Sequence, residues 1–480
     1  MADMTLLTPE LTLVGTGLAV LLIGLFLSAK TKKILGYLAS LGILASLVLV
    51  VTSLGTEGML FNDTLSFDAL SQFFKIVFLS VALLVSIASI KYTEGNAHTE
   101  EFYSLMIFAT AGMMFVASAN DLMVLFVAFE LASLATYALA GFEKKNPVSL
   151  EASMKYFMIG SLSAALMLFG ISFIYGATGT TSIPGVAENI SLLLGSPMGL
   201  LAVVLMIAGL GFKIALVPFH MWAPDTYQGS PSVVSSLLAA GSKKMGFVAA
   251  FKVFMIALVA LQAEWTTAFA ILAVITMTLG NVVALSQTSV KRMLAYSSVA
   301  QAGYITMAFV VMTKTALAGA ILYALSHGFM KAGAFIATAA VTYMVLSEKK
   351  DAEMPDHIDN FRGLGKRMPV TALCMTIFLF ALAGIPLTAG YMSKFVLFAS
   401  TIEAGLVWLA VIAILNSAIS LFYYARVVKY MYFLPSDGVK IAEPKSYTFA
   451  MVIAAIFVLA IGFWSEPFIY WAMEAAKVLI

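Results

Sequence analysis

The chain is divided into about fourteen runs of mostly apolar residues, each close in length to a membrane-spanning helix. A helix needs roughly 20 apolar residues to cross the hydrocarbon core of a bilayer. With 61% hydrophobic and 11% charged residues, the 480-residue chain has too little polar surface to cover a water-soluble fold. We therefore predict an all-α integral membrane protein. The predicted spans are 8–28, 34–53, 69–90, 102–118, 121–142, 148–176, 199–228, 231–257, 266–286, 293–312, 315–345, 369–400, 405–433 and 446–474.

The basic residues between these spans are sorted to one side of the predicted membrane. Loops that follow odd-numbered spans hold seventeen of the 27 Lys and Arg residues, whereas the opposite loops and termini hold only Lys314 and Lys477. Cytoplasmic loops carry such an excess of positive charge, so we expect both termini on the outer face of the cell membrane. The seventeen are Lys30, Lys32, Lys33, Lys91, Lys144, Lys145, Lys291, Arg292, Lys349, Lys350, Arg362, Lys366, Arg367, Arg426, Lys429, Lys440 and Lys445.

Eight lysines fall within the spans, and one acid, Glu130, lies well inside a span. An ionisable group in the bilayer core costs at least about 2.5 kcal/mol, so such groups usually have a function. A lysine buried without a carboxylate partner has a lowered pKa and can release its proton, whereas a nearby carboxylate keeps it charged. A Glu–Lys pair that can separate is therefore a switch for proton uptake and release. The eight are Lys75, Lys155, Lys213, Lys243, Lys244, Lys252, Lys331 and Lys394.

These lysines differ in their distance from the span ends. Lys75 and Lys252 lie within a few residues of the outer boundary, where we expect their side chains to reach water. Four others lie well inside their runs, and we expect them to be buried and functional, the alternative being structural ion pairs. These four are Lys155, Lys213, Lys331 and Lys394.

Two further placements depend on helical spacing. Lys243 and Lys244 point about 100° apart on a helix. Small residues share the face of Lys243, as in a helix–helix contact, whereas the Lys244 face resembles a lipid-facing surface, so we favour Lys243 as the functional residue and keep Lys244 as an alternative. His327 and Lys331 share a face with Tyr323, a spacing that suits a proton relay, the alternative being an inter-helix hydrogen bond.

Two spans contain residues that interrupt a helix. Pro218 interrupts the seventh span beyond Lys213, and Pro386 interrupts the twelfth span before Lys394. Broken helices in membranes occur where protein or water satisfies the freed carbonyls. The breaks are five spans apart and so run in opposite directions, which indicates an inverted repeat with ion sites near the midplane. The predicted divisions are 1–100 for helices 1–3, 101–262 for the first repeat (spans 4–8), 263–435 for the second repeat (spans 9–13) and 436–480 for helix 14.

Several segments together resemble the antiporter-like membrane subunits of respiratory complex I. They are FELASLATYAL, GFKIALVPFHMWAPDTYQGSPS, AGSKKMGF, VKRMLAYSSVAQAGY and AGIPLTAGYMSKF. The resemblance covers nearly the whole chain. Because a lysine follows the twelfth-span break, the chain most resembles subunit N, the counterpart of mitochondrial subunit 2. Other phrases, such as FELASLATYALAGFEKKNP, are similar to the F420H2 dehydrogenase of methanogens, and the choice between that subtype and a bacterial NADH:quinone enzyme stays open.

The resemblance implies a proton-translocating subunit and assigns its residues. Entry is expected near Glu130 and Lys213, passage along a central axis through Lys243, and exit past Lys394. The implied translocation residues are Glu130, Lys155, Lys213, His220, Lys243, His327, Lys331 and Lys394, with Pro218 and Asp225 in the motif around the first break. The resemblance also implies F420H2 or NADH as electron donor, methanophenazine or quinone as acceptor, and FAD or FMN and iron–sulfur clusters in partner subunits.

The sequence also limits the chemistry expected of this chain. A single cysteine, Cys374, and four dispersed histidines argue against an iron–sulfur cluster, haem or zinc. The expected partners are other antiporter-like and small membrane subunits and the lipid bilayer, with no nucleic acid. The alternatives are a subunit of a multi-subunit sodium/proton antiporter, a non-conducting scaffold, and a redox enzyme in its own right.

Overall fold

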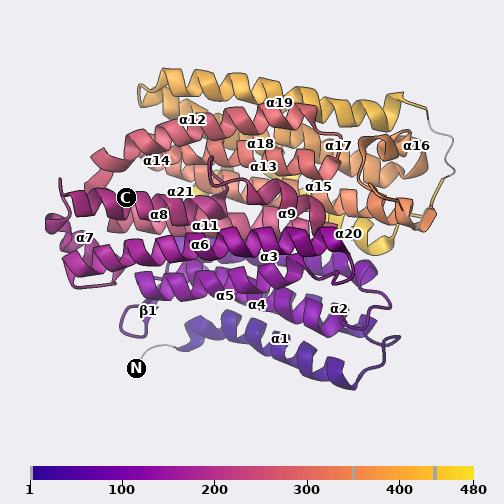
Figure 1. Ribbon diagram of the computed structural model, residues 1–480, viewed down its shortest axis with the longest axis horizontal. Coiled ribbons are helices and arrows are strands. Elements are labelled where there is room, and N and C mark those ends of the chain that lie inside the picture. Colours follow the sequence, from indigo (N-terminus) through magenta and orange to yellow (C-terminus); the bar gives the residue numbers. More distant parts are fainter. Residues whose placement is uncertain (1–3, 349–351, 436–439) are drawn as a thin grey trace.

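The computed structural model describes residues 4–348, 352–435 and 440–480, which form a bundle of long helices running in alternate directions (Figure 1). Lys349 and Lys350 of the predicted basic loop, and the predicted boundary at 436, lie outside these residues. In these ranges twelve helices are long and apolar enough to cross a membrane. The two predicted spans missing from that number, 231–257 and 369–400, are present as shorter helical segments. The predicted all-α fold of about fourteen spans is therefore confirmed.

The first six spans are continuous helices. The structure gives them as α1 (Thr8–Phe26), α2 (Lys33–Thr52), α3 (Ala69–Tyr92), α4 (Thr99–Ser118), α5 (Leu122–Ala140) and α6 (Pro147–Thr178). Local signals set several of their ends: Asp68 and Asp121 accept hydrogen bonds from the first backbone amides of α3 and α5. Short elements join these helices, namely η1 (Met4–Leu7), the antiparallel strands β1 (Gly58–Leu60) and β2 (Leu65–Phe67), α7 (Ile183–Glu188) and η2 (Ile190–Leu192).

The seventh span is broken, as predicted, into α8 (Pro197–Ile214) and α9 (Trp222–Gly229). Ala215, with left-handed backbone angles, ends α8, and the indole Nε1 of Trp222 donates to the Phe212 carbonyl at 2.8 Å. The eighth span comprises α10 (Ser232–Leu237), the π-helical η3 (Leu238–Ser242), α11 (Lys243–Phe251) and the π-helical η4 (Lys252–Ala257).

The remaining spans complete the bundle. They are α12 (Gln262–Ser286), α13 (Val290–Thr306) with α14 (Ala308–Val311), α15 (Lys314–Glu348), the broken pair α17 (Pro369–Ala383) and α18 (Ala389–Glu403), α19 (Val407–Phe433), and α20 (Lys445–Phe463) with α21 (Glu466–Ala476). The connecting elements are η5 (Val259–Leu261), η6 (Ile358–Phe361) and α16 (Leu364–Arg367). The predicted span 446–474 is therefore two helices, separated at Trp464 and Ser465.

Helix packing repeats at an offset of five spans. α4 packs along α5 as α12 packs along α13, and α6 packs along both halves of the seventh span (α8 and α9) as α15 packs along both halves of the twelfth (α17 and α18). A residue with left-handed backbone angles ends the first half of each broken span: Ala215 after α8 and Gly384 after α17. This correspondence agrees with the predicted inverted repeat, while the exact divisions of the chain stay a prediction.

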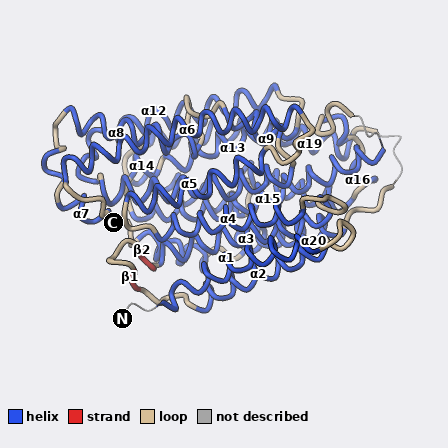
Figure 2. The backbone as a smooth tube through the Cα atoms, turned by 60° about the horizontal axis from the view of Figure 1, so that its bottom comes forward, coloured by secondary structure: helices blue, strands red, loops and turns tan. Residues whose placement is uncertain are grey.

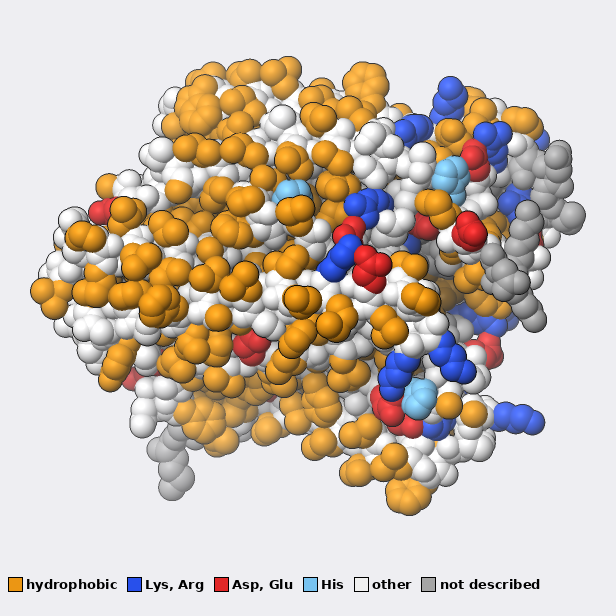
Figure 3. Space-filling view, viewed as in Figure 1, with side chains coloured by type: hydrophobic (Ala, Val, Ile, Leu, Met, Phe, Trp, Pro, Cys, Tyr) orange, Lys and Arg blue, Asp and Glu red, His pale blue; other side chains and the backbone are white. Residues whose placement is uncertain are grey.

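The two ends of the bundle differ in charge. Both chain termini lie at one end, which we call the terminal end (Figures 1 and 2). Lys and Arg side chains gather toward the opposite end, which we call the basic end, and hydrophobic side chains cover the rest of the visible face (Figure 3). α3 runs between the two ends, from Asp68 at the terminal end to Tyr92 at the basic end. The arrangement matches the predicted sorting of charge between loops.

Candidate functional site

Lys213 lies in the last turn of α8 and is completely buried. Its Nζ donates to Ser133 Oγ on α5 and to Tyr156 Oη on α6, both at 2.9 Å. Glu130, also on α5, has a buried Oε1 with no hydrogen-bond partner among the described residues. Two hydroxyl groups, rather than the predicted carboxylate, therefore hold the ammonium group in this state of the protein.

Lys155 differs from the prediction. Its side chain on α6 is 45% exposed and forms ion pairs with Glu151 at 2.7 Å and with Asp225 at 2.8 Å. The second oxygen of Asp225 pairs with Arg292 at 2.6 Å. The expectation of a buried lysine without a carboxylate partner is thus wrong, because the broken seventh span brings α9, and with it Asp225, against α6.

The centre of the bundle holds three basic residues. Lys243 and Lys244 on α11 and His327 on α15 are all buried. Lys244 Nζ donates to the Ala239 carbonyl at 2.8 Å and is hydrogen-bonded to His327 Nδ1. Lys243 Nζ donates to the Ser298 carbonyl at 3.1 Å. The lipid-like face predicted for Lys244 is therefore wrong, and both lysines point into protein.

The two π-helical segments lie next to these lysines. η3 directly precedes Lys243, and η4 begins at Lys252. A π-helix bonds each residue to the fifth rather than the fourth neighbour, so it changes which residues share a face. The described residues of this span are buried on all sides except for the partly exposed Ile256. A face predicted from ideal α-helical spacing consequently fails here.

A chain of polar side chains begins at Lys331. Its Nζ donates to Ser297 Oγ at 2.7 Å, and Ser297 is hydrogen-bonded to the hydroxyl of Tyr424. Gln301 Nε2 donates to Tyr424 Oη at 3.3 Å and to the Leu382 carbonyl at 3.2 Å. The chain therefore joins α15, α13, α19 and α17 inside the second half of the bundle.

Lys394 completes this chain at the second helix break. Its Nζ donates to the carbonyls of Leu382 at 2.9 Å and Ala383 at 3.2 Å, and to Ser417 Oγ at 2.9 Å. The last carbonyls of a helix lack partners within it and attract cations, so Lys394 caps α17. It also lies in the wall of a mostly apolar cavity of about 550 Å³ between α17, α18 and α19. The burial predicted for Lys213, Lys331 and Lys394 is confirmed.

His220 lies in the turn between α8 and α9 and is buried, with no hydrogen-bond partner for Nδ1 among the described residues. None of the hydrogen bonds described for the lysines Lys213, Lys243 and Lys244 involves it. The predicted role of His220 stays a prediction.

Two lysines predicted to reach water are instead buried. Lys75 is 2% exposed and forms an ion pair with Glu10 at 2.7 Å. Lys252 is 2% exposed and donates to the Ala119 carbonyl at 2.8 Å. The prediction fails because other elements cover these side chains: the centre of the Phe67 ring of β2 lies 4.0 Å from Lys75 Nζ, and α7 packs against η4, which begins at Lys252. Glu10 is a buried acid near the start of the first span, and its burial was not predicted from the sequence.

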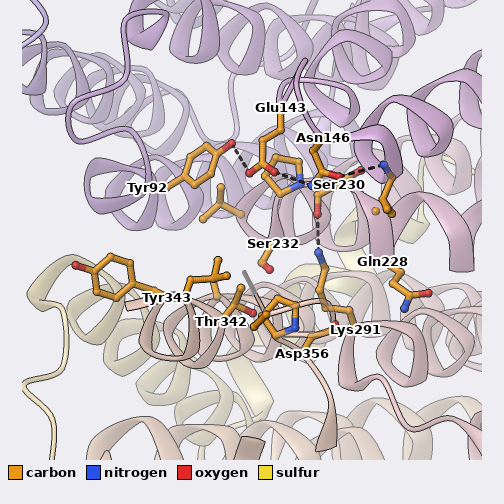
Figure 4. A pocket seen from close by; sticks show the side chains of 18 of the residues that line it. Tyr92, Glu143, Asn146, Gln228, Ser230, Ser232, Lys291, Thr342, Tyr343 and Asp356 are labelled. Carbon is orange, nitrogen blue, oxygen red and sulfur yellow. Dashed lines mark hydrogen bonds between the residues drawn. The ribbon is translucent and has the colours of Figure 1, made fainter. Parts of the chain in front are cut away.

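A polar cavity of about 580 Å³ opens at the basic end (Figure 4). Lys291 points into it and donates to the Ser230 carbonyl at 2.5 Å, and Glu143 accepts hydrogen bonds from Tyr92 and Asn146, both at 3.2 Å. The cavity reaches Ser232, where the eighth span begins. On its rim, hydrogen bonds from Lys91 and Lys33 hold the pKa of the exposed Glu94 carboxyl below its usual range. Because the cavity reaches Ser232, water can approach the span that carries Lys243 and Lys244.

Several polar residues of the site were not predicted from the sequence. Ser297 and Gln301 lie in the segment VKRMLAYSSVAQAGY, and their spacing of four residues, which places them on one face of α13, could have indicated a polar stripe. Ser133, Tyr156 and Tyr424 carry no such signal. Ser133 and Tyr156 contact Lys213, which is more than 50 residues away, and Tyr424 contacts Ser297, which is 127 residues away. In the described ranges no group of three or more His, Cys, Asp or Glu side chains is placed to hold a metal ion.

Known proteins resemble this chain in sequence and in fold. Residues 119–420 match the family described as NADH:quinone oxidoreductase/Mrp antiporter, TM. The F(420)H(2) dehydrogenase subunit N of Methanosarcina mazei is 68% identical, with 100% of both chains covered. The NADH-quinone oxidoreductase subunit N of Trichlorobacter lovleyi is 40% identical, covering 99% of this chain and 98% of that protein.

A solved structure agrees with these relatives. A chain of respiratory complex I from Thermus thermophilus with bound aureothin superposes with a TM-score of 0.80 and 30% identity, covering 96% of this chain and 99% of that chain. The resemblance stated from the sequence motifs is thus confirmed. The chain belongs to the NADH:quinone oxidoreductase/Mrp antiporter transmembrane family, as a member of its subunit N type.

Proposed function

We propose that this chain is a proton-translocating membrane subunit of a complex I-type oxidoreductase. Protons enter from the basic end, move through the buried lysines and leave past Lys394. The chemistry of electron transfer takes place in partner subunits, and this chain converts their conformational changes into proton movement.

The observation that carries this proposal is the set of buried amino groups whose described hydrogen bonds go to neutral hydroxyl, imidazole and carbonyl groups rather than to carboxylates. Lys213 contacts two hydroxyl groups, Lys244 contacts the imidazole of His327, and Lys331 reaches Lys394 through side chains and one shared carbonyl. Buried lysines are costly in a membrane, and a neutral partner allows them to lose a proton, whereas a carboxylate would hold them charged. A purely structural role would favour ion pairs, such as that of Lys75 with Glu10.

Glu130 supplies the switch. Its carboxyl group shares α5 with Ser133, one helical turn away, and Ser133 accepts from Lys213. A shift of α8 relative to α5 that brings the carboxylate to Lys213 would favour proton uptake, and separation would favour release. Lys155 has a different role. Its exposed side chain, paired with Asp225, joins α6 to α9, so that movement of the helix break is transmitted to α6.

The relatives support an assignment of the electron donor and acceptor of the complex. The 68% identity to an F420H2 dehydrogenase subunit favours F420H2 as donor and methanophenazine as acceptor, with NADH and quinone as the other pair. FAD or FMN and iron–sulfur clusters would then lie in partner subunits, and the present chain would hold no redox centre. The basic end faces the cytoplasm and both termini face outward across the cell membrane.

The test is Lys213→Ala in the assembled complex, reconstituted into sealed vesicles with a pH-sensitive dye inside. We expect electron transfer to persist or slow while proton movement coupled to it is lost. Lys213→Arg is the matched control for charge, because Arg keeps the charge but does not release a proton, and it should fail in the same way. Unaltered proton movement in both variants would refute the proposal.

The family also contains antiporter subunits, so sodium/proton exchange is the second candidate. The two functions differ in energy source. Exchange driven by a sodium gradient, in vesicles given no electron donor, would favour the antiporter, whereas proton movement that needs the donor favours the proposal.

A further inference from the structure

A second charged cluster lies at the terminal end of the bundle, apart from the lysines of the proposed function. A cavity of about 490 Å³ opens there between the β hairpin, the start of α3, the end of α4 and η4. Lys252 and Asp68 lie in its wall, and Asp68 is partly exposed. α3 connects this cavity to the basic-end cavity, so the two openings lie at opposite ends of one membrane span.

One hydroxyl group joins the buried amine to the partly exposed carboxylate. Lys252 Nζ lies 3.4 Å from Ser66 Oγ, and Ser66 Oγ donates to Asp68 Oδ2 at 2.9 Å. A serine hydroxyl can accept one hydrogen bond while it donates another. Ser66 therefore has the geometry to pass a proton from an amine inside the protein to a carboxylate at the cavity.

The other charged groups around Lys252 leave Asp68 as its acceptor. Lys75 and Glu10 form their own ion pair, so that pair contributes little net charge. Glu57 lies on the cavity wall on the hairpin side and is exposed. Lys252 also begins a π-helical segment, and such segments occur frequently at functional sites.

Lys252 lies on the same span as the central lysines. It follows Lys244 by eight residues, which is about 12 Å along a helix. Val248 and Phe251, both buried, fill this interval. An apolar constriction conducts only when water enters it, so the interval separates the two sites in this structure and prevents a continuous leak.

We infer that Lys252, Ser66 and Asp68 form a second proton-release site, beside the exit past Lys394, that delivers protons from the eighth span to the terminal end. This inference rests on the proposed proton translocation. In each step the Lys252 ammonium gives a proton to Ser66 Oγ while the Ser66 hydroxyl proton passes to Asp68 Oδ2. The resulting carboxylic acid loses that proton to water in the cavity, and the neutral amine of Lys252 takes the next proton from the interior.

The test uses the complete membrane complex in sealed vesicles, with Asp68→Asn, Ser66→Ala and Lys252→Arg measured beside Lys213→Ala. Asn is also a good helix N-cap, so Asp68→Asn keeps the start of α3 while it removes the carboxylate. Arg keeps a charged donor near the Ala119 carbonyl but does not release a proton. A structural role would therefore tolerate Lys252→Arg, whereas a release site would not.

We expect each of the three variants to lower the number of protons moved per electron, but by less than Lys213→Ala does because the exit past Lys394 remains, with electron transfer retained. Glu57→Gln is the control, since it changes a carboxylate on the same cavity outside the hydrogen-bonded chain, and it should leave the ratio unchanged. A normal ratio in Asp68→Asn and Ser66→Ala would overturn the release site alone if Lys213→Ala still loses proton movement. A normal ratio in all variants, Lys213→Ala included, would overturn the proposed function as well.

Discussion

Lys244 and His327 are hydrogen-bonded to each other in the middle of the bundle, through Nζ and Nδ1. Both are buried, and His327 Nε2 has no hydrogen-bond partner among the described residues. Two positive charges this close repel strongly in a low-dielectric interior, so at most one of the two side chains is positively charged at a time. The pair therefore forms a single proton-carrying unit between α11 and α15.

Of the two adjacent lysines on α11, Lys244 rather than Lys243 is expected to carry the proton. We expect Lys244→Met to reduce proton movement by at least about tenfold, because a positioned acid–base group contributes at least that much. Lys243→Met should have a smaller effect, since the described hydrogen bond of Lys243 goes to a backbone carbonyl that cannot take up a proton. Proton movement in vesicles measures both variants, and the reverse order of effects would restore Lys243 as the central residue.

The hydroxyl of Tyr156 is expected to stabilise the buried Lys213. Tyr156→Phe removes one of two side-chain hydrogen bonds to this amine, and a hydrogen bond to a charged group contributes about 1.5–3 kcal/mol to stability. The unfolding midpoint of the detergent-solubilised protein should fall. Tyr175→Phe on the exposed face of the same helix is the control and should leave the midpoint unchanged. Equal midpoints for the two variants would contradict the assignment.

The ion pair of Lys75 with Glu10 is predicted to be a structural element. Lys75→Met or Glu10→Leu alone leaves an unpaired buried charge, which typically costs about 3–5 kcal/mol. The double variant should recover most of this loss, because an apolar pair of similar size replaces the ions without a desolvation cost. Chemical denaturation of the three variants forms a double-mutant cycle, and strictly additive losses would contradict the pairing.

The hydroxyl of Tyr424 is predicted to connect Lys331 to Lys394. Tyr424→Phe removes the group that links Ser297 to Gln301 while it keeps the aromatic ring. We expect slower proton movement with normal assembly. Tyr423→Phe is the matched control, because the neighbouring hydroxyl donates to Asn281 at 2.8 Å instead. If the two variants move protons at the same rate, the chain through Tyr424 is not the route.

The second helix break is predicted to depend on Gly390. A Cβ at this position would lie 1.8 Å from the Ala381 carbonyl oxygen, so the start of α18 must approach α17 without a side chain. Gly390→Ala should prevent normal packing and lower the amount of assembled complex. Gly176→Ala on α6, where a Cβ meets nothing within 4 Å, should be neutral or slightly stabilising. Immunoblots of the membrane-bound complex distinguish these outcomes.

The sequence by itself determined the spans, both helix breaks and the burial of Lys213, Lys331 and Lys394. These features depend on local properties. Twenty apolar residues in succession suffice to specify a membrane helix, and a proline removes a backbone donor wherever the chain places it. The alternating charge of the loops likewise depends on order along the chain, so it could be read without knowledge of which helices touch.

Only the tertiary structure decided which partner each charged group meets. Lys155 pairs with Asp225 because α9 folds back on α6, and Lys75 pairs with Glu10 because α1 and α3 place them together at the terminal end. Lys244 points at His327 in a span with two π-helical segments, where ideal α-helical spacing misplaced it. Hydropathy and spacing describe one helix at a time, whereas an ion pair or relay depends on the packing of helices distant in the sequence.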